Sequence, residues 1–198
     1  DFMDFHAISR WEQDPRNRKF DKEIETGVAV LRHIRKLFPK ARIVFRDGNH
    51  EERWERYFWL KAPEFLDLAN FQMESVLEFD ELGIERVTNK QPIAAGKLHI
   101  LHGHEYRAGF VPAVNPARGL FLRAKVSACC GHFHQTSQHS EKNLEGKIVS
   151  TWSSGCLCDL HPDYMPLNNH GHGFIWIEVD ASGRFQVENL RILDGRIY

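Results

Sequence analysis

The sequence contains no long apolar run, no internal repeat and no excess of charge of either sign. No stretch approaches the roughly 20 apolar residues that a transmembrane helix needs, and no signal peptide is recognisable. Lysine and arginine together number 26 and aspartate and glutamate 27, so the formal net charge is −1. This balance provides no overall attraction to membranes or to nucleic acid, and we expect no membrane association.

Cysteine is also scarce, with four residues in a chain of 198. Neither Cys129 and Cys130 nor Cys156 and Cys158 have the spacing of a disulfide framework, and a chain of this length builds a core without one. We therefore expect a reducing, cytoplasmic setting and a single domain over residues 1–198. Histidine, in contrast, is plentiful. Eight of the 12 histidines lie between positions 102 and 172, and histidine is both a common metal ligand and a common acid or base.

Hydrophobic periodicity and turn residues predict helices first and mostly strands later. We expect helices at residues 21–38, 52–61, 65–70, 73–79 and 117–124. We expect strands at residues 43–45, 84–88, 97–101, 126–130, 147–152, 174–179 and 184–190, and the end of a strand at residues 1–6. This order of elements predicts an α/β or α+β domain with two packed sheets.

The stretch Gly48-Asn49-His50-Glu51 lies between a predicted strand and a predicted helix. The carboxyl ends of strands are where α/β sheets bind ligands. An asparagine amide oxygen can bind a metal ion, and the adjacent histidine can transfer a proton. The chemistry of this turn therefore depends on which other residues join it.

Potential ligands also follow two later strands, at His102 and at the pair His132 and His134. Residues two apart in an extended segment project to the same side. We therefore expect His132-Phe133-His134 to be extended, with both imidazoles directed to one place. Asp1 is a further candidate. Carboxylate, amide and imidazole ligands suit manganese, iron and zinc.

Four short blocks occur in order: Asp1-Phe-Met-Asp4, Gly48-Asn49-His50-Glu51, His102-Gly103 and Gly131-His132-Phe133-His134. They resemble four of the five blocks of the calcineurin-like metallophosphoesterase superfamily. The segments 1–11 and 154–160 further resemble phage and prophage members, which implies the cytoplasm of a bacterial or phage-infected cell. The implied fold is α/β, with two packed mixed β-sheets flanked by helices in a four-layer sandwich.

The resemblance implies a role for each matched residue. Asp1 would bridge two divalent metal ions, with manganese expected first and iron, zinc or nickel as alternatives. Asn49, His102 and His132 would complete one metal site, and His134 would belong to the other. A metal-bridging hydroxide would attack phosphorus, and His50 would protonate the leaving oxygen. Asp4 would hydrogen-bond to His50 and favour its protonated form.

The family's first block, Asp-x-His, has no clear counterpart here. Asp4-Phe5-His6 matches it literally, but no Gly-Asp block lies between His6 and Gly48. We therefore interpret Asp1-x-x-Asp4 as the second block and expect the first strand and two ligands to lie upstream. On this interpretation one metal site is incomplete in residues 1–198, and we expect this chain by itself to be inactive or strongly impaired.

The expected subclass and substrate follow from positions at which this chain differs from one class of the superfamily that it resembles. Protein Ser/Thr phosphatases of the superfamily carry arginine where this chain has Asp47, and Arg-Gly where it has Phe5-His6. We therefore expect a phosphodiesterase acting on a phosphate ester, such as a nucleotide or nucleic acid. Residues expected to contact the substrate are Arg53, His104, Tyr164, His170 and His172. Arg53 has a second interpretation as a solvated charge on its helix.

Two other functions and one further metal site remain open. The protein could be a nucleic-acid-processing or binding subunit, or a catalytically impaired metal-binding scaffold because its first block is missing. The sequence does not predict its oligomeric state. Separately, a structural zinc ion could be held by residues of one loop, namely Cys156, Cys158, His161, His170 and His172. The alternative for this loop is that it forms a wall of the active site.

Overall fold

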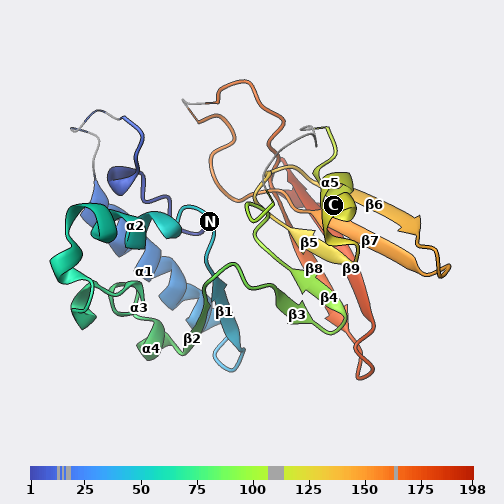
Figure 1. Ribbon diagram of the computed structural model, residues 1–198, viewed down its shortest axis with the longest axis horizontal. Coiled ribbons are helices and arrows are strands. Elements are labelled where there is room, and N and C mark those ends of the chain that lie inside the picture. Colours follow the sequence, from blue (N-terminus) through green and yellow to red (C-terminus); the bar gives the residue numbers. More distant parts are fainter. Residues whose placement is uncertain (13, 15, 17–18, 107–113, 163–164) are drawn as a thin grey trace. The chain divides into compact units, whose positions relative to one another are not determined.

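The computed structural model describes residues 1–12, 14, 16, 19–106, 114–162 and 165–198. These residues form a mixed α/β protein with two compact units, unit 1 (residues 1–90) and unit 2 (residues 91–198). Figure 1 shows helices concentrated in unit 1 and strands in unit 2. The predicted order, helices first and strands later, is therefore confirmed. Among the described residues, no helix has the length and hydrophobicity that crossing a membrane requires.

Unit 1 is built on helix α1 (Phe20–Leu37), which matches the helix predicted from its apolar spacing. Val28 and Leu31 are buried on one face of the helix. Gly27 lies on the same face, where a Cβ atom would meet the Met3 sulfur at 2.6 Å. The absence of a side chain at this glycine therefore allows the first residues of the chain to pack directly on α1.

Strand β1 (Ile43–Arg46) pairs in parallel with β2 (Ile84–Val87). The Gly48–Glu51 turn follows β1 and leads into helix α2 (Glu52–Lys61). The predicted strand-turn-helix arrangement around Asn49 is thus confirmed. Trp54 of α2 is buried, and its indole N–H donates to the Phe71 carbonyl at 2.9 Å.

Two predictions in unit 1 are wrong. Residues 1–5 form no strand, and they lead into the 3₁₀ helix η1 (His6–Ile8). The helices expected at 65–70 and 73–79 are replaced by four shorter ones, η3 (Pro63–Phe65), η4 (Ala69–Phe71), α3 (Met73–Val76) and α4 (Phe79–Leu82). The break between α3 and α4 occurs at Glu78, whose φ of 57° is left-handed and incompatible with a continuous helix.

Unit 2 contains a five-stranded sheet in the order β3-β4-β5-β7-β6. The strands are β3 (Ile93–Ala95), β4 (Leu98–Ile100), β5 (Ala128–Cys130), β6 (Ser137–Lys142) and β7 (Ile148–Ser153). The three central strands are parallel and both edge strands are antiparallel. The prediction omitted both edge strands, because one is only three residues long and the other, Ser-Gln-His-Ser-Glu-Lys, carries almost no apolar residues.

A three-stranded antiparallel sheet completes unit 2, with β8 (Gly173–Val179), β9 (Phe185–Leu193) and β10 (Arg196–Ile197). Its apolar side chains pack on Leu98, Cys129 and Trp152 of the larger sheet. Helix α5 (Pro116–Ala124) covers the opposite face, where its Leu120 packs on Ala128 and Cys130. Two packed sheets are thus present within unit 2, and Cys129 and Cys130 are buried thiols on opposite faces of β5.

Candidate functional site

The turn after β1 places His50 against two acidic side chains of unit 1. Its Nδ1 atom is 3.2 Å from Asp4 Oδ1, and its backbone N–H donates to Asp1 Oδ1 at 2.9 Å. The hydrogen bond with His50 is the largest influence on Asp4 and lowers the pKa of that carboxyl, although burial opposes it. Asp4 is therefore ionised at neutral pH, and it can orient the imidazole.

The geometry of this turn depends on Glu51, a residue to which the sequence analysis gave no role. Its carboxylate is completely buried. Oε1 accepts hydrogen bonds from the backbone N–H groups of Phe2 and Met3, at 2.7 and 2.9 Å, and Oε2 accepts from Gly48 at 2.9 Å. Glu51 thus ties the segment that carries Asp1 to the turn that carries His50. Glu51 is the fourth residue of the Gly-Asn-His-Glu block, and this place in the block was the signal in the sequence that could have identified its role.

Arg53 contacts the same group of residues rather than projecting into solvent. Its Nη1 atom donates to Asp4 Oδ1 at 3.0 Å, and the Arg53 side chain is only 17% exposed. The interpretation of Arg53 as a solvated helix charge is therefore wrong. Its guanidinium group also helps to lower the pKa of Asp4.

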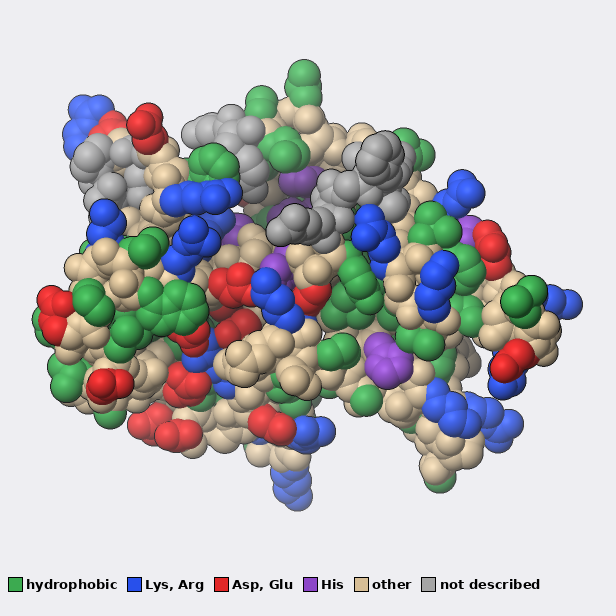
Figure 2. All heavy atoms as spheres, viewed as in Figure 1, with side chains coloured by type: hydrophobic (Ala, Val, Ile, Leu, Met, Phe, Trp, Pro, Cys, Tyr) green, Lys and Arg blue, Asp and Glu red, His purple; other side chains and the backbone are tan. Residues whose placement is uncertain are grey.

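A cleft of about 590 Å³ lies beside Asn49 within unit 1. Its lining comes from η1, the residues after it, Asn49 and α2, and it includes the acidic Glu52 and a larger group of basic and aromatic side chains. These side chains are Arg10, Trp11, Arg53, Arg56, Tyr57 and Lys61. Figure 2 shows Lys and Arg side chains close together on this part of unit 1. The net charge of the chain is close to zero and did not predict this cleft. The basic side chains gather there only in the folded structure.

In unit 2 the loop after β4 and the loop after β5 bring His102 and His132 together. Their facing nitrogens, Nε2 of His102 and Nδ1 of His132, are 3.1 Å apart. The backbone N–H of His132 also donates to the His102 carbonyl at 2.9 Å. Gly103 makes this approach sterically feasible, since it has φ +122° and its Cβ would lie 2.9 Å from that of His132.

His104 lies close to the same pair, with its ring centroid 5.1 Å from that of His102. Burial, and then the neighbouring imidazoles of His102, His104 and His134, lower the pKa of His132 to about 3. The His132 ring is therefore neutral at neutral pH, which is the form that binds metal ions. The structure thus brings three of the predicted histidines together.

The expected extended geometry of His132-Phe133-His134 is wrong. The segment forms a turn in which the His134 N–H donates to the Gly131 carbonyl at 3.0 Å, and His134 has a left-handed φ of 55°. Phe133 packs on the core beneath α5. Because the chain reverses here, the two imidazoles do not project side by side as they would from a strand.

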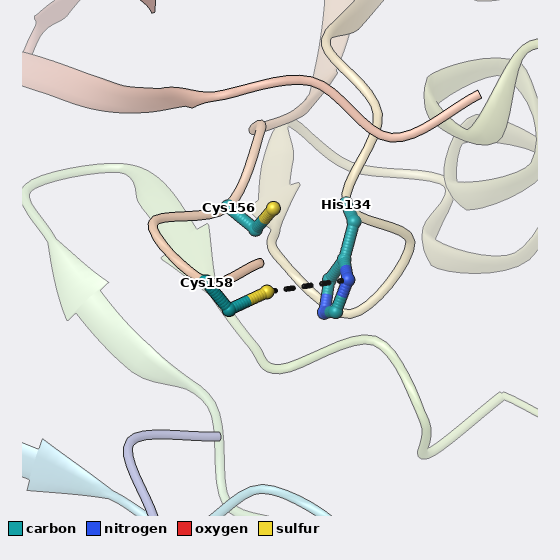
Figure 3. A group of neighbouring side chains, drawn as sticks. All are labelled: His134, Cys156 and Cys158. Atoms are coloured by element: carbon teal, nitrogen blue, oxygen red, sulfur yellow. Dashed lines mark hydrogen bonds between the residues drawn. The ribbon is translucent and has the colours of Figure 1, made fainter. Parts of the chain in front are cut away.

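His134 instead lies with two thiols of the loop after β7. One ligand atom from each of His134, Cys156 and Cys158 lies within 4.8 Å of the others. Figure 3 shows the Cys158 sulfur directed toward the imidazole and the Cys156 side chain next to that of Cys158. Burial is the main cause that raises the pKa of the Cys158 thiol to about 11, and the adjacent Cys156 raises it further.

The remaining predicted residues have different outcomes. The His170 ring packs edge-on against that of His134, with centroids 4.7 Å apart. His172 Nε2 donates to the Cys158 carbonyl at 2.8 Å, so His172 supports the loop. Within the described residues, His161, His170 and His172 are not members of the group formed by His134 and the two cysteines. Tyr164 lies outside the described residues.

Comparison with known proteins gives one informative similarity. The gene 54 protein of Mycobacterium phage L5 is 27% identical to this chain over 144 residues. The match covers 68% of this chain and 54% of the phage protein, so the matched region spans about half the length of that relative. No family model matches the chain, and no solved structure matches it. The similarity to a phage protein agrees with the phage-type resemblance, whereas membership of the metallophosphoesterase superfamily stays a prediction.

Proposed function

We propose that this protein is a metal-dependent phosphoesterase that hydrolyses a phosphodiester of a nucleotide or nucleic acid. The observation that carries the proposal is the Asp4–His50 pair beside the Asp1 carboxylate at the end of β1. A carboxylate that orients a histidine is the arrangement that general acid catalysis uses. The buried Glu51 carboxylate, which accepts three backbone hydrogen bonds, keeps this arrangement in place.

The residues present fit the divalent ions that the resemblance implies. Unit 1 offers the carboxylate of Asp1 and the amide oxygen of Asn49. Unit 2 offers the imidazoles of His102 and His132, and the pKa of His132 near 3 keeps that ring in its neutral, metal-binding form. Oxygen and imidazole ligands are accepted by manganese, iron, nickel and zinc. Such ions would supply an activated water and stabilise negative charge on the phosphate oxygens.

The residues of unit 1 then have separate tasks. His50 donates a proton from its Nε2 atom to the leaving oxygen, because its Nδ1 atom faces Asp4. Asp4 holds the ring in the orientation that this transfer needs. Arg53 keeps Asp4 ionised and in place through its hydrogen bond to Oδ1. Protonation of the leaving group matters most for substrates whose leaving oxygen is strongly basic.

The cleft beside Asn49 supports a nucleotide or nucleic-acid substrate. Arg10 and Arg56 supply positive charge for phosphate groups outside the scissile bond. Trp11 is 59% exposed, with the Arg10 guanidinium 4.8 Å over one face of its ring, and Tyr57 is also exposed, so one face of the Trp11 ring and the Tyr57 ring are available to stack on a base. A phosphomonoester would leave most of this lining unused, which favours a diester. The finer fold, a four-layer metallophosphoesterase sandwich, belongs to this same proposal.

The same cleft favours a second candidate, a nucleic-acid-binding subunit without hydrolytic activity. Basic and aromatic side chains in one cleft bind single-stranded nucleic acid in many proteins. This candidate requires salt-dependent binding through Arg10 and Arg56 but gives no role to the hydrogen bond between Asp4 and His50.

The two candidates are separated by assaying the complete gene product with manganese on two classes of phosphodiester. One class has a p-nitrophenol leaving group and the other a simple alkyl alcohol. His50→Ala is expected to lower kcat on the alkyl ester by on the order of 10² to 10⁴, and much less on the nitrophenyl ester, which leaves without a proton. His33→Ala, an exposed histidine of α1, is the matched control. Equal losses on both esters would contradict the general-acid role. Nucleic-acid binding without hydrolysis of either ester would support the second candidate.

A further inference from the structure

We propose that His134, Cys156 and Cys158 form a second kind of metal site in unit 2, one that binds a thiophilic divalent ion such as zinc. The site is independent of the phosphoesterase chemistry proposed above. Two thiolates and an imidazole are ligands that zinc prefers, whereas manganese and magnesium prefer oxygen. The resemblance had assigned His134 to the catalytic metals, but the structure places two thiols beside it.

The distances match the ligand spacing of a tetrahedral zinc site. Zinc–sulfur and zinc–nitrogen bonds of about 2.3 and 2.0 Å place neighbouring ligand atoms about 3.3 to 3.8 Å apart in a tetrahedral site. Cys158 Sγ lies 3.9 Å from His134 Nδ1, and the ligand atoms of all three residues are within 4.8 Å of one another. The group therefore needs only a small contraction to close around an ion. Figure 3 shows the three side chains next to one another, with the Cys158 sulfur directed toward the imidazole.

Backbone hydrogen bonds hold these ligands in place without the ion. The Cys156 N–H donates to the Gly171 carbonyl at 2.9 Å, and the Gly173 N–H donates to the Cys156 carbonyl at 3.0 Å. The Gly171 N–H donates in turn to the His134 carbonyl at 2.9 Å. Three chain segments are thus joined around the group, so the ligands are preorganised rather than being two mobile thiols in a loop.

Gly155 explains how two of these segments come so close. A Cβ atom at this position would lie 2.4 Å from the Gly171 carbonyl oxygen and 2.6 Å from the Gly173 nitrogen, which is too close for any side chain. The hydrogen bond from His172 to the Cys158 carbonyl fixes the far side of the same loop. Support of ligands by surrounding hydrogen bonds is typical of protein metal sites.

We assign His170 as the fourth ligand, and its side chain has to move toward the ion, because its ring nitrogens are not among the ligand atoms that lie within 4.8 Å of one another. Its ring packs against that of His134, and its Nδ1 atom is buried with no hydrogen-bond partner in the part of the chain that the structure describes. A buried imidazole nitrogen without a partner costs free energy, which binding to a metal ion would recover. Zinc in structural sites has four protein ligands, and a Cys₂His₂ set is among the common ones.

The proposal is tested by cobalt substitution in the complete protein, because thiolate ligands give cobalt a sulfur-to-metal charge-transfer absorption that oxygen and nitrogen ligands do not. We expect this absorption in the chelator-stripped protein after cobalt is added, and its displacement by zinc. Cys156→Ser, Cys158→Ser and His134→Ala should each abolish it or weaken cobalt binding at least tenfold. His170→Ala should weaken binding less than these, and His161→Ala, in the same loop, should leave it unchanged.

Two further variants keep the test decisive. Cys158→His should bind cobalt with a weaker sulfur absorption, which distinguishes a ligand from a residue needed only for folding. Asn49→Ala alters the proposed phosphoesterase ligands but should leave the sulfur absorption intact, so failure of one proposal is distinguishable from failure of the other. A folded protein that shows no sulfur absorption with cobalt would overturn the site. A Cys156–Cys158 disulfide in metal-free protein purified under reducing conditions would overturn it as well.

Discussion

At the scale of single residues, two carboxylates position the segment that carries Asp1 and Asp4. Glu51 binds the N–H groups of Phe2 and Met3, and Glu23 of α1 accepts a hydrogen bond from the Phe5 N–H at 2.6 Å. Phe5 is completely buried and has a left-handed φ of 48°. This conformation is uncommon for a bulky residue, and the hydrogen bond from its N–H group stabilises it.

The Glu23 carboxyl is expected to make the stability of the protein depend on pH. Burial is the main cause that raises the pKa of Glu23, and the nearby Asp4 charge adds to it. A carboxyl whose pKa is higher in the folded state stabilises the fold most at low pH and loses that contribution as pH rises through the folded pKa. Glu23→Gln keeps an oxygen that can accept from Phe5 and removes the charge. We therefore expect the variant to become more stable relative to the unmodified protein as pH rises from about 4 to 7.

Urea unfolding at several pH values measures this difference. Glu25→Gln, an exposed position on the same helix, is the control and should show no such trend. If the stability difference between Glu23→Gln and the unmodified protein stays constant over this range, the Glu23 carboxyl has no raised pKa and its burial plays no electrostatic role.

At the scale of secondary-structure elements, Arg86 of β2 joins the end of β1 to two helices. It makes a bidentate ion pair with Asp47, at 3.0 and 2.7 Å, and its Nη1 atom donates to Glu74 of α3 at 2.9 Å. The Arg86 and Asp47 side chains are only 7% and 12% exposed. Asp47 therefore has a structural role in unit 1, as the buried partner of Arg86.

Arg86→Met should destabilise unit 1 by about 3 kcal/mol, because it leaves the Asp47 carboxylate buried without its partner. The free energy of unfolding from urea titration measures the loss. Arg42→Met removes an ion pair with Glu85 whose side chains are 72% and 52% exposed, and it should cost less than about 1 kcal/mol. Similar losses from both substitutions would mean that burial does not strengthen the Arg86 pair.

At the scale of the whole molecule, each hydrophobic cluster is made of residues from one unit. The largest cluster includes Phe5, Trp54 and Phe79 of unit 1. In unit 2 one cluster lies beneath α5, and another, which includes Trp152, lies between the two sheets. A unit with its own core satisfies the main requirement for folding independently.

We therefore expect residues 91–198, expressed alone, to unfold cooperatively on heating and to retain the cobalt–thiolate absorption of His134, Cys156 and Cys158. Calorimetry and absorption spectroscopy measure the two properties. The same fragment with Trp152→Ala, which removes a ring from the core between the sheets, is the destabilised reference and should melt at a lower temperature. A broad, non-cooperative transition in the unmodified fragment would show that unit 2 depends on residues 1–90 for its structure.

Local sequence patterns determined several features of this protein by themselves. The apolar spacing of α1, the strand-turn-helix around Asn49 and the buried strand β5 were predictable, because helical and strand periodicity are properties of short segments. The resemblance of short blocks also predicted that Asp4 would lie beside His50. Each of these features depends on residues that are close in sequence or that belong to a recurring block.

Only the tertiary structure decided which distant groups meet. The left-handed turn at His134, the support that Glu51 gives to Phe2 and Met3, and the basic cleft beside Asn49 all depend on packing between segments far apart in sequence. Cys156 and Cys158 share their loop with several histidines in the sequence, whereas the fold brings them to His134. The physical reason is that a periodic pattern specifies which side of an element is buried, but the approach of two loops depends on backbone hydrogen bonds and on the space that a residue such as Gly155 leaves open.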